Sequence, residues 1–173
     1  NFVNRTIVLT HKYFEGKVPQ RGTLNELDIQ TIEQIKQYPE KIGRSIEQYR
    51  FREALNELMN LARLGNKYLT ENEPWKTIKT DPERTATVLN ISLQICANLA
   101  LLSEPFLPFT AEKLRGMLNQ DKVFWYQAGN SELLEEGKQI NPAQLLFEQI
   151  DDKQIEAQLE KLQQTKKANE LAS

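Results

Sequence analysis

The stretch PERTATVLNISLQICANLALL, Pro82–Leu102, decides the fold that we expect for this chain. Apolar side chains would occur almost all the way round a helix formed by it. They are Val88, Leu89, Ile91, Leu93, Ile95, Cys96, Leu99, Leu101 and Leu102. A helix that is apolar on nearly every side must be buried by neighbours on several sides. The stretch therefore predicts the central helix of a bundle.

The start of this helix is marked in the sequence. Asp81 can cap the helix, Pro82 suits the first helical position, and Glu83 complements the positive end of the helix dipole. A polar break, TENEPWKTIKT over residues 70–80, precedes it and separates it from an earlier helical run.

Four further runs have apolar residues at helical spacing, with Gly and Pro signals between them. They cover residues 1–14, 23–38 and 39–70, together with a run that follows a proline-marked turn and ends near Leu118. We expect Pro39 to separate the second run from the third, and Gly65 to mark a close approach of another helix. The prediction is an all-α, antiparallel bundle of about five helices over residues 1–118.

The C-terminal part has a different pattern. Residues 119–150 indicate a loop and an extended linker, and residues 151–173 indicate a single amphipathic helix. The apolar stripe of this helix is narrow, with Ile155, Leu159 and Leu162 as its main members. A helix with so little to bury needs a partner surface.

Composition narrows the classes of function. The 173 residues carry a net charge of −2, with 14 Lys/Arg against 12 Asp/Glu in residues 1–84 and 8 against 12 in the rest. Such a chain is no general polyanion binder, so any nucleic-acid site must be small and rely on stacking and base contacts. One cysteine, Cys96, excludes a disulfide framework, and it lies in an apolar run typical of a buried thiol.

Catalytic and targeting motifs are missing from the sequence. There is one histidine, His11, and no HExxH, GxGxxG or phosphate-binding loop, so we expect no catalytic and no metal-binding residues. No signal peptide and no uncharged apolar stretch of about 18 residues occurs, which favours a cytoplasmic protein without a membrane partner. The chain begins inside a helical pattern without an initiator methionine, so we expect a piece of a longer protein.

Two features can carry recognition. Pro74 fixes the backbone beside Trp75, so this tryptophan either plugs the end of the bundle or offers a flat platform for stacking, which is worth about 1–3 kcal/mol per base. Asn1 and Arg5 are four residues apart and share a helix face, where they could read base edges or form an ordinary solvated surface. The residues alone leave both alternatives open.

Several motifs together resemble a known family. The segments NFVNRTIVLTHKYFEGKVP (residues 1–19) and NKYLTENEPWKTIKTDPERTATVLNISLQICANLALLSEPFLPFTAEKL (residues 66–114) are similar to the C-terminal anticodon-binding domain of bacterial-type methionyl-tRNA synthetases. The later LLFEQIDDKQIEAQLEKL (residues 145–162) resembles the segment after the bundle in that family. Related class I synthetases share the bundle but are not expected to combine these motifs. A structural or protein-interaction bundle remains the alternative interpretation.

The resemblance implies specific roles. The domain would bind the CAU anticodon loop of methionine tRNA, with Trp75 stacking on the first base and Arg5 and Asn1 contacting the bases. Pro74 would shape the loop, and further positions would fix the loop or contact phosphates. These positions are Asn66, Lys67 and Lys79. The family also uses an upstream asparagine one helical turn before Asn1, so we expect the site in this chain to be incomplete.

The resemblance also implies what this chain lacks. The HIGH-like and KMSKS-like signatures, which bind ATP and activate methionine in the family, do not occur in the sequence, and neither does a zinc-binding insertion. We therefore expect no enzymatic activity and no cofactor in this fragment, with ATP used by the catalytic domain of the parent ligase. That catalytic domain is also the partner on which residues 151–173 would pack.

Overall fold

The computed structural model describes residues 1–147 and 150–171. Its helices are α1 (Phe2–Phe14), α2 (Glu26–Glu47), α3 (Phe51–Asn72), α4 (Pro74–Thr77), α5 (Pro82–Leu102), α6 (Pro108–Leu118), the 3-10 turn η1 (Trp125–Gln127) and α7 (Asp152–Leu171). Within these residues the single β-type pairing is one antiparallel bridge between Lys17 and Gln139. The predicted all-α bundle is confirmed, and α4 is a single turn inside the predicted polar break.

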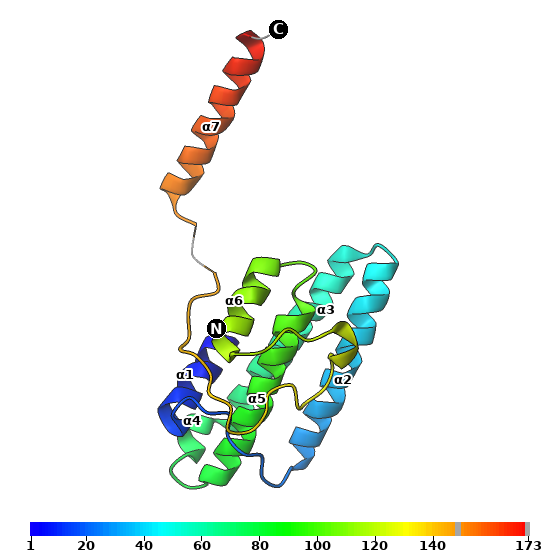
Figure 1. Ribbon diagram of the computed structural model, residues 1–173, viewed down its shortest axis with the longest axis vertical. Coiled ribbons are helices and arrows are strands. Elements are labelled where there is room, and N and C mark those ends of the chain that lie inside the picture. Colours follow the sequence, from blue (N-terminus) through cyan, green and yellow to red (C-terminus); the bar gives the residue numbers. More distant parts are fainter. Residues whose placement is uncertain (148–149, 172–173) are drawn as a thin grey trace.

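Helix α5 is the centre of the bundle, as its sequence predicts (Figure 1). Every residue from Thr87 to Leu102 is buried, and α1, α2, α3, α4 and α6 all pack against this helix. Within the described chain α5 is also the one helix long and apolar enough to cross a membrane, but its apolar window is entirely buried by protein. Burial raises the pKa of the Cys96 thiol to about 12, which keeps it neutral.

A row of buried amides on α5 is not evident from its apolar pattern. Asn90, Gln94 and Asn98 recur every four residues and hold irregular backbone against the helix. The amide of Gln94 donates to the carbonyl of Leu134 (2.8 Å) and accepts from its N–H (2.9 Å). Asn98 likewise accepts from the N–H of Gly129 (2.7 Å). These bonds satisfy polar groups that burial would otherwise leave unpaired.

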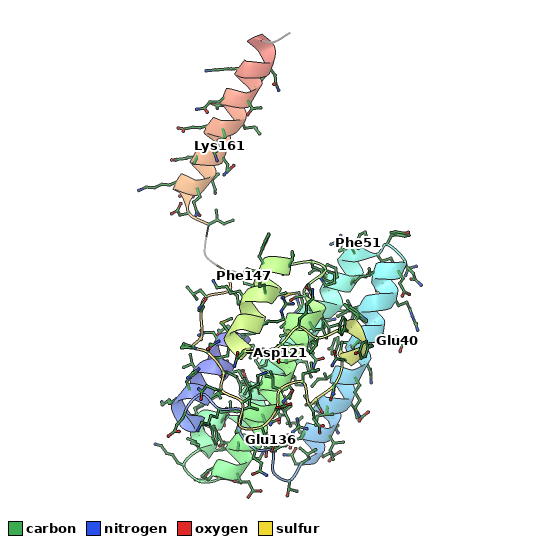
Figure 2. All side chains as sticks on the ribbon, in the orientation of Figure 1. Glu40, Phe51, Asp121, Glu136, Phe147 and Lys161 are labelled. Carbon is green, nitrogen blue, oxygen red and sulfur yellow. The ribbon has the colours of Figure 1, made fainter. Side chains whose placement is uncertain are left out.

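The irregular segment after α6 therefore lies across the bundle, as the yellow ribbon in Figure 1 shows. Leu134 and Ile140 belong to the main core, and Trp125 packs 3.6 Å from the position that a Cβ on Gly43 would take. Helix α7 stands clear of the bundle, and the side chains of residues 151–167 are exposed (Figure 2).

The predicted boundary at Pro39 is wrong. Helix α2 continues through Pro39 to Glu47, and the chain turns instead at Tyr49, whose φ is 58°. An interior proline costs a helix about 3 kcal/mol. Ile35 and Ile42, one on each side of the proline, are both fully buried, and their burial offsets this cost because it requires one continuous helix.

Gly65 marks a close approach, as predicted. A Cβ at this position would lie 2.5 Å from the ring of Phe2 in α1 and 3.0 Å from Ile95 in α5. The missing side chain is what allows the first turn of α1 to sit on α3.

This packing gives a test with an internal control. We expect Gly65→Ala to lower the free energy of unfolding by about 1–3 kcal/mol, because the Phe2 ring must move. Gly116→Ala, on α6 with open space around the new Cβ, should raise it by up to about 1 kcal/mol through helix propensity. Urea denaturation followed by circular dichroism measures both. A stabilising Gly65→Ala would show that the approach of α1 is not tight.

Candidate nucleic-acid interface

The side chains of Arg5 and Trp75 meet at the surface between α1 and α4. The guanidinium carbon of Arg5 lies 5.1 Å from the centre of the Trp75 ring, which is a cation–π arrangement. Both side chains are half-buried. Trp75 is therefore neither a core plug nor a fully open platform, because the Arg5 guanidinium covers part of its surface.

The turn between α3 and α4 sets the position of Trp75. Glu73 adopts left-handed backbone angles (φ 42°, ψ 55°) and ends α3, and Pro74 immediately starts α4. A left-handed conformation at a residue other than glycine is strained, so the surrounding contacts must hold it. Pro74 is buried, whereas the ring of its neighbour Trp75 reaches the surface. Pro74 has a fixed φ and a buried ring, so the backbone immediately before Trp75 has little freedom.

Asn1 lies one helical turn before Arg5. The backbone N–H of Arg5 donates to the carbonyl of Asn1 (3.0 Å), and the Asn1 side chain is exposed and makes no capping hydrogen bond. Residues four apart lie on one helix face, so the Asn1 amide is on the side of α1 that carries Arg5.

The other predicted positions are more peripheral. Asn66 and Lys67 are exposed on α3 directly after Gly65, beside the first turn of α1, and Lys67 forms an ion pair with Glu71 (3.8 Å). Lys79 is exposed in the turn after α4. The described interactions bring Arg5 and Trp75 together but do not join Asn66, Lys67 or Lys79 to that pair.

A buried charged cluster joins α2, α3 and α5, and the sequence patterns do not predict it. Asp28 of α2 is fully buried and accepts two bonds from the Arg84 guanidinium, at 2.5 and 2.8 Å. The hydroxyl of Tyr68 donates to the same carboxylate (2.6 Å). Asp28 also completes the capping box of α2 with Asn25. No local signal reveals this cluster, since Asp28 and Arg84 are 56 positions apart.

The pKa of Asp28 reflects two opposing effects. Burial alone raises it, but the hydrogen bonds from Arg84, Tyr68 and the backbone of Asn25 outweigh burial, so the pKa lies below its usual value of 3.8. The hydrogen bond to Asp28 is the main reason that the pKa of Arg84 is raised. The cluster is therefore an ionised pair, with the Tyr68 pKa raised by burial first and by Asp28 second.

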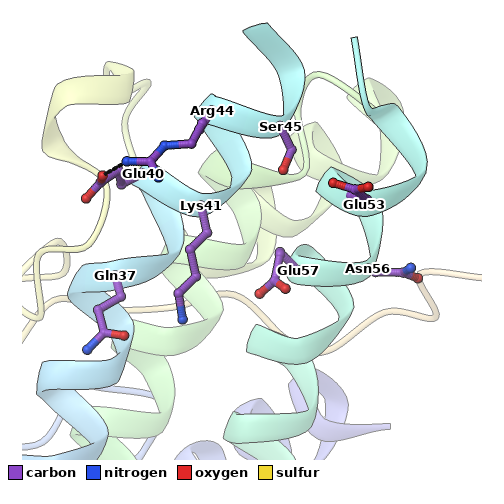
Figure 3. A pocket seen from close by; sticks show the side chains of 8 residues that line it. All are labelled: Gln37, Glu40, Lys41, Arg44, Ser45, Glu53, Asn56 and Glu57. Atoms are coloured by element: carbon purple, nitrogen blue, oxygen red, sulfur yellow. Dashed lines mark hydrogen bonds and ion pairs between the residues drawn. The ribbon is translucent and has the colours of Figure 1, made fainter. Parts of the chain in front are cut away.

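A polar groove between α2 and α3 lies elsewhere (Figure 3). It is lined by Gln37, Glu40, Lys41, Arg44, Ser45, Glu53, Asn56 and Glu57. Its α3 residues belong to the first turns of that helix, whereas Trp75 follows the last turn, roughly 30 Å along the axis. The groove takes no part in the Arg5–Trp75 site. In the part of the chain that the structure describes, no cluster of His, Cys, Asp or Glu suitable for a metal ion occurs.

Comparison with known proteins identifies the class of protein to which this chain belongs. Residues 18–167 match the family described as the anticodon binding domain of methionyl tRNA ligase. The chain is 54% identical over 173 residues to a methionine–tRNA ligase of Phocaeicola vulgatus and 56% identical to one of Cytophaga hutchinsonii. Both matches cover 100% of this chain and 25% of the relative, so the chain spans about a quarter of their length.

Solved structures agree on the fold. The apo methionyl-tRNA synthetase of Mycobacterium tuberculosis superposes with a TM-score of 0.78 at 22% identity, over 87% of this chain and 31% of that chain. The same enzyme in complex with methionyl-adenylate gives a TM-score of 0.77 over 86% of this chain and 30% of that chain, also at 22% identity. These structures share the fold, and the family match identifies it as that of an anticodon-binding helical domain. The chain belongs to the family of anticodon-binding domains of methionyl-tRNA ligases.

The Asp28–Arg84 pair predicts a pH dependence of stability. A lowered pKa in the folded state means that Asp28 stabilises the fold above its unfolded pKa, and that this contribution is lost as the pH falls below 3.8 and through the folded pKa. We expect Asp28→Asn to lower the free energy of unfolding by about 3 kcal/mol at pH 7, because it leaves Arg84 partly buried without its charge partner. The difference from the unmodified chain should shrink in acid.

Urea denaturation at a series of pH values from 7 to 2.5 measures this. Glu40→Gln is the control, because Glu40 pairs with Arg44 on an exposed surface and its loss should change little at any pH. A difference between Asp28→Asn and the unmodified chain that stays constant down to pH 2.5 would contradict the assignment.

Proposed function

We propose that this chain reads the CAU anticodon loop of methionine tRNA, as part of an ATP-dependent methionine–tRNA ligase. The observation that carries the proposal is the guanidinium of Arg5 placed 5.1 Å from the Trp75 ring centre, in a family described as anticodon-binding. In this proposal Trp75 stacks on the first anticodon base, and Arg5 and Asn1 contact the pairing edge of that base.

The chemistry of cytosine suits these side chains. Its pairing edge presents two acceptors and one donor. Arginine donates only, so it can address the acceptors, whereas the amide of asparagine can both donate and accept. Bases of an RNA loop must be splayed out to be read, and stacking on Trp75 offsets part of the cost of unstacking them.

The Arg5–Trp75 contact is compatible with a base-binding site to which no RNA is bound. A cation–π contact at a half-exposed position is worth about 0.5–1 kcal/mol, less than the 1–3 kcal/mol of base stacking. A base can therefore compete with Arg5 for the indole, and the guanidinium released from the ring stays close enough to bond the base. We assign the same contact the role of keeping the ring ordered while no RNA is bound.

Phosphate contacts are the proposed role of the peripheral polar residues. Lys67 has a side chain 71% exposed, and its pair with Glu71 is loose at 3.8 Å, so little is lost if a phosphate replaces that carboxylate. Asn66 is exposed on α3, and Lys79 is exposed in the turn after α4. With few cations, affinity should depend on salt only modestly.

Family membership also supports proposals about the parts of the longer ligase that lie outside this chain. ATP binding and methionine activation belong to a catalytic domain outside this chain. The chain by itself does not charge tRNA. The ligase acts in the cytoplasm. Helix α7 packs against the catalytic domain through Ile155, Leu159 and Leu162, which are all exposed here.

Binding to a stem-loop tests base reading. The unmodified chain should bind a CAU anticodon stem-loop more tightly than a UAU stem-loop in fluorescence-polarisation titrations. Trp75→Ala should weaken CAU binding about tenfold or more, and Arg5→Ala should remove most of the preference for CAU. Trp125→Ala is the matched control, because that tryptophan packs on Gly43 of α2, away from α4.

The same variants separate recognition from a purely structural bundle. If Trp75 is a base platform, Trp75→Ala leaves the thermal midpoint nearly unchanged. Equal binding of CAU and UAU would refute base reading by this chain. A loss of several degrees in the Trp75→Ala melt without any RNA effect would favour the structural interpretation.

Hydrogen exchange tests the role of α7. We expect the amides of residues 155–162 to exchange rapidly in this chain, because no side chain of the described helix from 151 to 167 is buried. The corresponding helix in the whole Phocaeicola vulgatus ligase should exchange far more slowly, since its apolar stripe is then covered. Rapid exchange in both proteins would argue against packing on the catalytic domain.

A further inference from the structure

We propose that the first turn of α5 positions the Trp75 ring by clamping both ends of the segment that carries it. Arg84 holds Asn72, the last residue of α3, and Thr85 holds Thr77, the last residue of α4. Trp75 lies between the two clamps. The role assigned to Arg84, Thr85 and Asn72 rests on the proposed function of Trp75 as a base platform.

The front clamp is formed by a single side-chain amide. The guanidinium of Arg84 donates to the Asn72 oxygen (2.5 Å), and the Asn72 nitrogen donates to the carbonyl of Tyr68 one turn back (2.8 Å). The amide thus ties the C-terminal turn of α3 to α5. The next residue, Glu73, is the left-handed one, so the direction in which α4 leaves α3 is defined from a fixed point.

Arg84 is itself rigid enough to serve as that fixed point. It forms two bonds with the buried carboxylate of Asp28, and its backbone N–H is held by the capping side chain of Asp81 (2.9 Å). A planar guanidinium engaged on two edges keeps one orientation. The buried carboxylate of Asp28 therefore fixes the orientation of Arg84, and Arg84 in turn fixes the end of α3.

The rear clamp uses hydroxyl groups. The Thr85 hydroxyl donates to the carbonyl of Asp81 (3.1 Å), which leaves its oxygen to accept from the Thr77 hydroxyl at 2.8 Å. The backbone N–H of Asp81 also donates to the carbonyl of Thr77 (2.7 Å). The end of α4 is thereby fixed to the same turn of α5 that holds the end of α3.

Between the clamps the backbone has little freedom. Glu73 is in a single left-handed conformation, Pro74 has a fixed φ and a buried ring, and α4 is one helical turn. A ring held in this way is preorganised, so a base that stacks on it loses less free energy to ordering. Arg5 touches the ring directly, whereas Asn72 acts only through the backbone, and the two effects can be separated by experiment.

The experiment uses the whole 173-residue chain with Trp125→Phe, so that Trp75 is the single tryptophan. Asn72→Ala removes the front clamp but leaves the Arg84–Asp28 pair intact, and thermal melts verify folding. We expect a larger acrylamide quenching constant and a lower fluorescence anisotropy for Trp75. CAU stem-loop binding should weaken about fivefold, the factor expected for one hydrogen bond.

Two controls distinguish positioning from a general loss of structure. Asn60→Ala removes a comparable amide from the same helix, where it accepts a bond from Arg63 (2.7 Å), and should change neither fluorescence nor binding. Asn72→Asp keeps an acceptor for Arg84 and should restore the anisotropy.

A double-mutant comparison completes the test. In a Trp75→Ala background, Asn72→Ala should have no further effect on RNA affinity, because its target is already absent. Unchanged quenching and anisotropy in Asn72→Ala, or an equal RNA effect with and without Trp75, would overturn the proposal. If no version of the chain binds the stem-loop, the proposed function fails for this chain, while the quenching and anisotropy results still decide whether Asn72 positions the ring.

Discussion

The burial of α5 on all sides from Thr87 to Leu102 is the constraint on which the rest of the structure depends. A helix buried on every side contributes more to the core than any other element, but its long polar side chains then need partners inside the protein. Gln94 and Asn98 find theirs in irregular backbone, which explains why residues 129–134 follow the helix closely without forming a helix or strand of their own. Asn90 finds its partners in the carbonyl of Pro19 and the guanidinium of Arg21. Burial thus organises both the helices around α5 and the loop that crosses them.

The same helix links the core to the candidate site. Its first turn contains Arg84, whose charge is balanced by the buried Asp28 of α2 and which also reaches the end of α3. A buried ion pair contributes little net stability compared with apolar packing, but it fixes geometry because only one arrangement satisfies both partners. Here the geometry that it fixes is the turn leading to Trp75.

Trp75 and Arg5 show why a site of this kind needs a folded scaffold. They come from helices that are 70 positions apart in the sequence, and each has an ordinary surface environment apart from the other. The guanidinium contacts the indole while both side chains remain half-exposed. Such a pair is accessible to a ligand and has a defined starting geometry, two properties that a small recognition site in a chain of net charge −2 requires.

The sequence by itself determined the class of fold, the central helix with its capped start, and the close approach at Gly65, because these follow from local patterns of apolar, capping and small residues. The resemblance of its motifs also indicated the family. The local sequence pattern placed the turn after α2 at Pro39, which is wrong. A proline signal depends only on neighbouring residues, whereas the burial of Ile35 and Ile42, which outweighs that signal, depends on the tertiary structure. Only the tertiary structure decided the contact of Arg5 with Trp75, the pairing of Asp28 with Arg84 and the amide row that holds the irregular segment. Each of these joins groups far apart along the chain. Although the three amides recur every four residues, nothing in the local sequence identifies the partner of any of these groups, because the partner is brought close only by the fold.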